Sequence, residues 1–264
     1  MFFKVKRPPT EKLDFIIAGV QKAGTTALSD LLESHPKIKM PHKDELHRTV
    51  QPARHFFDDE ERFAQTEVDY TPLHRGCTRK HDSILLGSCT PIYTYWKPAG
   101  ERIWNYNDKI KLLILLRNPA DRAFSHWNMQ RDRGLENLDF LAAVQEEKNR
   151  ARDATPFQLR KFSYVDRGFY GEQMNRVFRY FPREQVHTIK FEDFRRDPRK
   201  TLDAVCRFLH LEPLNNLNNV ETGSTPYTRK MTGSERQYLV DLYRSDIEGL
   251  EKLLGWDCSD WKKV

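Results

Sequence analysis

The chain has 264 residues, 44 lysines and arginines against 38 aspartates and glutamates, a formal net charge of +6 and 38% hydrophobic side chains. This length suits one large domain or two small ones, and 16 Phe, 10 Tyr and 5 Trp exclude a disordered chain. The positive charge suits an anionic partner such as nucleic acid, a phosphorylated cofactor or an acidic polymer, and its sign alone does not choose among them.

Targeting signals are not evident in the sequence. The longest apolar runs, 15–20 and 112–116, are too short to cross a membrane, and the N-terminal segment turns basic before a secretory signal could form. Four cysteines are scattered along the chain without a C-x-x-C pair, which favours reduced thiols over disulfides. We therefore expect a cytoplasmic protein that associates with no membrane.

Two units of strand, loop and helix stand out in the first half of the chain. The run 14–20 (D-F-I-I-A-G-V) predicts a buried strand, and the glycine and two threonines at 24–26 then open a helix. The run 111–116 (K-L-L-I-L-L) is apolar enough for a central strand of a parallel sheet. Pro119 suits the first position of a helix that continues to about residue 129.

Strands and helices keep alternating in the second half. The sequence predicts helices near 138–150 and 169–180, a strand at 186–190, a helix from Pro198, a long loop at 212–230 and a last helix that ends at Gly255. This order predicts an α/β fold: a single domain over residues 1–264 with a central parallel sheet flanked by helices.

The first motif lies between the first predicted strand and its helix. Residues 19–26 (G-V-Q-K-A-G-T-T) form a glycine-bearing loop whose backbone N–H groups and helix N-terminus suit a phosphate. A nucleotide-triphosphate P-loop needs a lysine directly after its second glycine, but Thr25 stands there and the lysine is Lys22.

This loop resembles the K-x-G-T-[TS] loop of the PAPS-dependent sulfotransferases, a family with a P-loop-like α/β fold. A second motif fits the same family, because residues 117–125 (R-N-P-A-D-R-A-F-S) match every fixed position of its R-x-P-x-x-R-A-x-S pattern. The chain is most similar to the glycosaminoglycan-sulfotransferase-like branch and its bacterial relatives. Three further stretches extend the resemblance: Thr90-Pro91-x-Tyr93, Gly168-Phe169-Tyr170 before Phe181-Pro182, and residues 253–257 before Trp261.

The resemblance implies 3′-phosphoadenosine 5′-phosphosulfate (PAPS) as donor and no metal. It implies that Lys22 stabilises the leaving phosphate and that Arg117 and Ser125 hold the 3′-phosphate. The other nucleotide contacts that it implies are Ala23, Gly24, Thr25 and Thr26 in the loop, Tyr170, and Thr225, Tyr227, Arg229 and Lys230 in place of the family's late basic loop.

The acceptor must also lose a proton, and the same branch uses the glutamate of a K-E-x-H-F-F-like segment as the base. Here residues 43–47 (K-D-E-L-H) supply the first half of that segment and residues 55–58 (H-F-F-D) the second. Glu45 is the leading candidate for the base, with His47 or His55 as the reserve. The expected acceptor is a hydroxyl or an amine of a small molecule or a saccharide.

Two other functions stay open. A small-molecule kinase would use the same loop, although its lysine is missing and the strand 111–116 ends in Arg117 rather than a metal-binding aspartate. A polyanion-binding module would use the net charge, although no nucleic-acid motif is present and we expect no nucleic-acid partner. Four aromatic residues are candidates for stacking on an acceptor ring: Trp96, Trp104, Trp127 and Phe157.

Overall fold

The computed structural model describes residues 4–5, 12–40, 55–74, 81–214, 227 and 229–264. Contacts divide the chain into two compact units, each assembled from separate segments. Unit 1 comprises Met1–Val20, Gly24–Leu115 and Val177–Thr222, and unit 2 comprises Gln21–Ala23, Leu116–Arg176 and Gly223–Val264.

The main sheet has the strand order β3-β5-β2-β6-β7. Its strands are β2 (Phe15–Gly19), β3 (Ile38–Lys39), β5 (Leu85–Cys89), β6 (Lys111–Leu116) and β7 (Val186–Lys190). β2 pairs in parallel with β5 and β6, and β3 pairs in parallel with β5, which confirms the parallel sheet. The predicted strands at 14–20, 111–116 and 186–190 are confirmed. Because β2 and β6 are parallel neighbours, the segments that follow them start from the same edge of the sheet.

β3 and β5 carried too little local signal to be predicted. β3 has only two residues, and Gly87 and Ser88 interrupt the apolar run of β5. A side chain at Gly87 would collide with Phe15 on β2, since a Cβ there would lie 2.2 Å from the ring. Two short strands, β1 (Lys4–Val5) and β4 (Glu67–Val68), pair in parallel as a separate small sheet.

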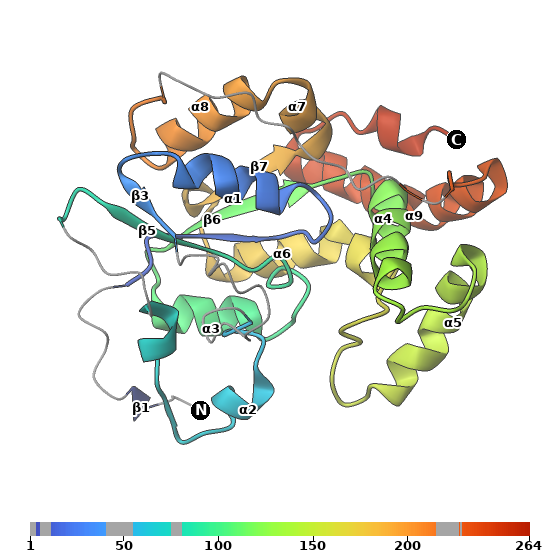
Figure 1. Ribbon diagram of the computed structural model, residues 1–264, viewed down its shortest axis with the longest axis horizontal. Coiled ribbons are helices and arrows are strands. Elements are labelled where there is room, and N and C mark those ends of the chain that lie inside the picture. Colours follow the sequence, from blue (N-terminus) through green and yellow to red (C-terminus); the bar gives the residue numbers. More distant parts are fainter. Residues whose placement is uncertain (1–3, 6–11, 41–54, 75–80, 215–226, 228) are drawn as a thin grey trace. The chain divides into compact units, whose positions relative to one another are not determined.

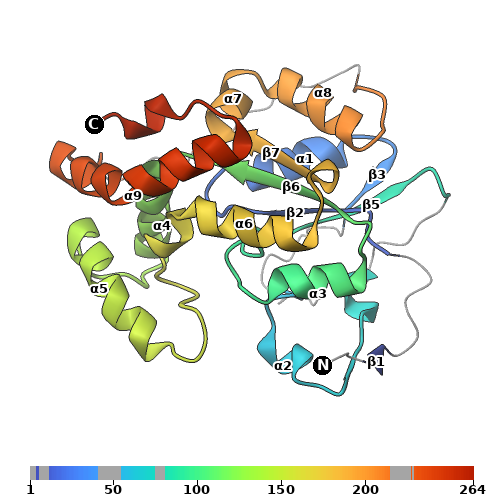
Figure 2. The ribbon, with the colours of Figure 1, turned by 180° about the vertical axis from the view of Figure 1, so that it is seen from behind.

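Helices cover both faces of the main sheet. Figures 1 and 2 show α1 (Thr25–Glu33) and α8 (Pro198–Phe208) over one face and α3 (Ala99–Tyr106) over the other. α8 begins at Pro198 as predicted, and the carboxylate of Asp197 caps it by accepting a hydrogen bond from the Lys200 N–H. The remaining helical segments of unit 1 are α2 (Glu60–Phe63), α7 (Phe191–Arg196), η1 (Thr71–His74) and η3 (Arg183–Gln185).

Unit 2 is helical. It contains α4 (Pro119–Asp132), α5 (Phe140–Asp153), the first part of α6 (Tyr170–Tyr180), α9 (Gly233–Leu254), η2 (Asp166–Gly168) and η4 (Ser259–Lys262). α4 packs against α5, α9 and η2. α9 ends before Gly255, as predicted, and starts at a capping box formed by Thr232 and Glu235.

Two of the four candidate stacking aromatics are core residues instead. The side chains of Trp96 and Trp127 are 3% and 2% exposed, and each indole N–H donates within its own unit, to Glu60 and to the Leu138 carbonyl. Large rings contribute most to burial, so a tryptophan near a site often serves packing. Trp104 and Phe157 are exposed. Among the described residues, no helix is both long and apolar enough to cross a membrane.

Candidate functional site

The loop between β2 and α1 has the backbone geometry of an anion site. Gly24 is the N-cap of α1 with φ of 83°, a backbone conformation that favours glycine. A Cβ there would also make a tight contact of 3.0 Å with the Phe191 ring. Lys22 adopts a left-handed φ of 74°, which is uncommon for a residue with a side chain. Because glycine offers no side-chain cap, the first-turn N–H groups of α1 remain suited to an anionic ligand.

The predicted loop residues differ in exposure. Ala23 is fully buried, Thr25 is nearly so, and Thr26 is exposed at the first turn of α1. Lys22 is half-buried. Of these residues, Lys22 and Thr26 therefore have side chains that a ligand can reach.

Positive charges gather around Lys22 in unit 2. The Arg117 guanidinium donates a hydrogen bond of 2.9 Å from Nη1 to the Lys22 carbonyl, which ties the end of β6 to the loop. Burial lowers the pKa of the Lys22 ammonium, and the charges of Arg117 and Arg133 lower it further. Such a group of cations is destabilised by mutual repulsion, and a bound anion would relieve it.

α4 carries the rest of the second motif. Asn118 caps the helix, since its side-chain oxygen accepts from the Ala120 N–H at 3.0 Å, and Pro119 occupies the first helical turn as predicted. Ser125 lies on α4 and is 3% exposed. The second arginine of the motif, Arg122, is fully buried and donates to the Tyr164 carbonyl, so it holds α4 against the segment before η2.

Tyr170 supports Arg117 from the core of unit 2. Its ring is 1% exposed and packs edge-on against Trp261, and its hydroxyl donates to the Arg117 carbonyl at 2.9 Å. This hydrogen bond supports the backbone of Arg117, a residue predicted to bind phosphate. Gly168, two residues earlier, is needed because a Cβ there would lie 2.5 Å from the Tyr243 hydroxyl.

Arg167 is a site residue that sequence reasoning missed. It is 3% exposed and donates to the Gln21 side chain at 2.7 Å, to the Ser163 hydroxyl at 2.7 Å and to the Arg160 carbonyl. Gln21 directly precedes Lys22, so Arg167 holds the start of the loop. The sequence feature that could have identified Arg167 is its position directly before Gly168, the first residue of the Gly-x-Tyr motif.

Glu147 anchors the backbone that carries Arg167. This α5 carboxylate is 5% exposed and accepts from the Val165 N–H at 2.6 Å and the Asp166 N–H at 2.8 Å. Burial raises its pKa to about 7. Through Glu147, α5 therefore fixes the segment that begins at Val165. From this segment Arg167 contacts Gln21, and Tyr170 contacts Arg117.

Two of the residues predicted as late nucleotide contacts, Arg229 and Tyr227, make contacts within unit 2. Arg229 forms a fork with Glu235, with distances of 2.6 and 2.8 Å, and its guanidinium lies 5.1 Å from the centre of the Trp127 ring. Tyr227 is 40% exposed and packs edge-on against Phe124. Lys230 is exposed, and Thr225 lies outside the described residues. The Arg229 contacts suit a residue that fixes this segment on α4.

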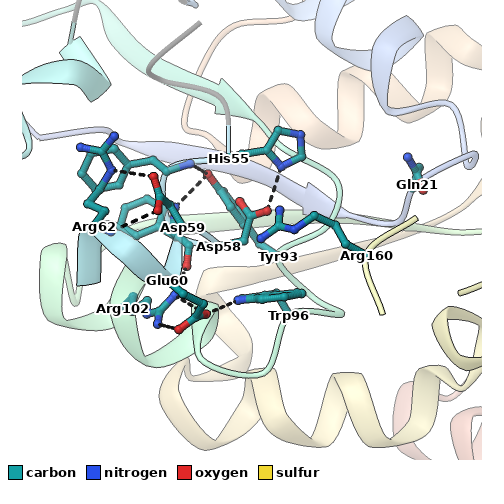
Figure 3. A network of polar contacts seen from close by, with 12 residues as sticks. Gln21, His55, Asp58, Asp59, Glu60, Arg62, Tyr93, Trp96, Arg102 and Arg160 are labelled. Atoms are coloured by element: carbon teal, nitrogen blue, oxygen red, sulfur yellow. Dashed lines mark hydrogen bonds and ion pairs between the residues drawn. The ribbon is translucent and has the colours of Figure 1, made fainter. Parts of the chain in front are cut away.

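Unit 1 contains a histidine and aspartate pair (Figure 3). The His55 Nδ1 lies 2.8 Å from the Asp58 carboxylate, which is fully buried, whereas the His55 side chain is 57% exposed. A carboxylate only accepts, so Nδ1 carries the hydrogen and the outer nitrogen, Nε2, is left as a proton acceptor. Glu45 and His47, the other candidates for the base, lie outside the described residues.

The chain belongs to the sulfotransferase domain family, whose sequence profile matches residues 12–231. That match includes the loop at Lys22, the α4 motif and the His55–Asp58 pair. Within the described part of the chain, no group of three or more His, Cys, Asp or Glu side chains is arranged to hold a metal ion.

Individual relatives agree with the family assignment. The chain is 28% identical over 207 residues to mouse (Mus musculus) heparan sulfate glucosamine 3-O-sulfotransferase 5, covering 75% of this chain and 53% of that protein. It is 27% identical over 272 residues to the human bifunctional heparan sulfate N-deacetylase/N-sulfotransferase 3, covering 91% and 29%. The chain thus spans about half or less of these two proteins.

One solved structure matches nearly the whole chain. The crystal structure of a sulfotransferase from Alicyclobacillus acidocaldarius matches with a TM-score of 0.78 and 27% sequence identity, over 96% of this chain and 100% of that one. The sulfotransferase domain of the Synechococcus PCC 7002 olefin synthase matches with a TM-score of 0.51 and 18% identity, which supports the fold alone.

Proposed function

We propose that this chain forms one catalytic domain that transfers a sulfuryl group from PAPS to a hydroxyl or an amine of a small-molecule or saccharide acceptor. The observation that carries the proposal is the group of cations around Lys22, a residue of a loop that suits phosphate and whose carbonyl accepts a hydrogen bond from Arg117. Membership of the sulfotransferase domain family supports the reaction class.

The donor nucleotide fits the residues present. It carries phosphates at the 3′ and 5′ positions of its ribose. Burial is the main cause of the lowered Lys22 pKa, and the phosphates would offset the repulsion from Arg117 and Arg133 that adds to it. When bound, it supplies the sulfuryl group and the leaving phosphate. Thr25, Thr26 and the loop N–H groups hold the 5′-phosphate, and Arg117 and Ser125 hold the 3′-phosphate.

Lys22 provides the electrostatic part of catalysis. Negative charge grows on the bridging oxygen as sulfuryl leaves, and a fixed ammonium stabilises that charge more in the transition state than in the ground state. The Arg117 hydrogen bond to its carbonyl supports the left-handed backbone of Lys22.

The acceptor proton passes to a base in the segment before α2. Among the described residues, His55 is the candidate, because Asp58 leaves its Nε2 free to accept and stabilises the imidazolium that forms. Glu45 remains the leading base proposed from the sequence, with His47 as a reserve. The heparan sulfate relatives make a saccharide the first acceptor class to test.

Transfer from a labelled donor to saccharide acceptors tests the proposal. We expect transfer by the wild type, a loss of at least a hundredfold in kcat for Lys22→Ala, and no change for Lys148→Ala, an exposed lysine on α5. Magnesium ATP serves as the alternative donor. Equal activity in Lys22→Ala and the wild type, or phosphoryl transfer from ATP, would overturn the assignment.

A further inference from the structure

The backbone between His55 and Asp58 needs hydrogen-bond partners from other parts of the chain. His55 has φ of 57°, in the left-handed region that costs a residue with a side chain roughly 1 kcal/mol. The two residues between the pair, Phe56 and Phe57, are both fully buried. Their buried N–H and C=O groups need partners, and these partners determine where the imidazole points.

Tyr93 supplies the first set of partners. Its hydroxyl accepts from the Phe56 N–H at 3.1 Å and the Phe57 N–H at 3.4 Å, and the residue is 3% exposed. Burial raises the pKa of this phenol, so it stays neutral. The tyrosine of the Thr-Pro-x-Tyr motif thus binds the two N–H groups that lie between His55 and Asp58.

Arg102, on α3, supplies the second set. Its guanidinium donates to the Phe57 carbonyl at 2.9 Å and to both oxygens of Glu60, at 3.0 and 2.6 Å. The Trp96 indole donates to the same Glu60 carboxylate at 2.7 Å (Figure 3). Arg102 is 9% exposed and its guanidinium lies 4.4 Å from the Phe63 ring centre, so this arginine is largely buried.

Side chains from two other elements therefore hold both the N–H and the C=O of Phe57. We propose that Tyr93 and Arg102 are positioning residues that set the His55–Asp58 geometry for proton transfer. This inference rests on the function proposed above for the pair. Without the Tyr93 hydroxyl, two buried N–H groups lose their acceptor, and the turn relaxes in a way that separates the imidazole from the carboxylate.

The test compares Tyr93→Phe with Tyr106→Phe. Tyr106 is a matched control, since it is 3% exposed and its hydroxyl accepts from the buried Leu13 N–H at 2.7 Å. We expect Tyr93→Phe to lower kcat at least tenfold with the dissociation constant of adenosine 3′,5′-bisphosphate within twofold of wild type. Tyr106→Phe keeps kcat within about twofold. Equal losses in both variants would identify a general stability effect and overturn the proposal.

Arginine variants give a second comparison. Arg102→Lys keeps the positive charge but loses the pair of hydrogen bonds that a planar guanidinium makes to one carboxylate. Arg150→Lys is the matched control, because Arg150 makes the same kind of pair with Glu136, at 2.5 and 3.1 Å. We expect the kcat loss for Arg102→Lys alone. An Arg102→Lys variant with wild-type kcat would remove Arg102 from the positioning role.

A spectroscopic readout separates this inference from the proposed function. Long-range ¹H–¹⁵N correlation spectra report which nitrogen of neutral His55 carries the hydrogen, and they require no activity. We expect the Nδ1–H form in the wild type and a shift toward the Nε2–H form in Tyr93→Phe. An unchanged spectrum would overturn the positioning role even if the protein proves to be a sulfotransferase. A changed spectrum in a protein without transfer activity would refute only the proposed function.

Discussion

Replacing Glu147 with glutamine removes a buried carboxylate whose protonation is linked to folding. Burial raises the Glu147 pKa from 4.5 to about 7, against the opposing effect of the Val165 and Asp166 N–H groups. A carboxyl with a raised pKa binds its proton more tightly in the folded state. The stability that it contributes is therefore complete below about pH 4.5 and is lost as the pH rises through about 7.

The magnitude follows from the size of this shift. A difference of roughly 2.5 pKa units, at 1.36 kcal/mol per unit, corresponds to about 3 kcal/mol of unfolding free energy. Glutamine does not titrate, so its own contribution is the same at every pH. The stability of the wild type relative to Glu147→Gln should therefore fall by about 3 kcal/mol between about pH 4.5 and pH 8.

Urea unfolding at a series of pH values measures the difference directly. Other titrating groups cancel, because both variants contain them. Glu248→Gln, at an exposed position on α9, is the control substitution, because it replaces a glutamate that is not buried. A wild-type advantage over Glu147→Gln that stays constant to within about 0.5 kcal/mol across this range would refute the reasoning.

Three further predictions concern the loop at residues 19–26 and the support of Arg117 beside it. The affinity for adenosine 3′,5′-bisphosphate, measured by calorimetry, should fall as the pH rises through the lowered pKa of Lys22, and Lys22→Met should abolish this dependence. Tyr170→Phe removes the hydrogen bond to the Arg117 carbonyl, so it should lower the free energy of unfolding by about 1 kcal/mol and weaken nucleotide binding severalfold. Unchanged binding would contradict a role for Tyr170 in supporting Arg117. Gly24→Ala should destabilise more than Gly134→Ala in urea unfolding, because both positions have positive φ but only Gly24 has close neighbours; equal losses would argue against a steric constraint.

Several motif residues bind other parts of the protein. The Tyr93 hydroxyl accepts from the Phe56 N–H, and the Tyr170 hydroxyl donates to the Arg117 carbonyl. Arg229 instead pairs through its guanidinium with the Glu235 carboxylate. A family motif therefore includes residues that support the local structure beside those, such as Lys22, that are proposed to bind a ligand.

The sequence by itself determined the features that depend on local signals. Continuous apolar runs predicted β2 and β6, Pro119 predicted the start of α4, and Gly255 predicted the end of α9. The sequence also indicated that the loop at residues 19–26 suits a phosphate, because a phosphate loop needs its glycine and its cation within a few residues of one another. Such features depend on the conformational preferences of neighbouring residues.

Only the tertiary structure decided how distant residues support one another. Arg167 and Gln21 are 146 positions apart, and Tyr93 lies 37 positions from Phe56, so no local pattern links either pair. An arginine in the sequence is equally consistent with a solvated surface charge and with a buried donor. Burial and hydrogen-bond partners distinguish the two, and they arise only when the chain folds and brings these groups out of water.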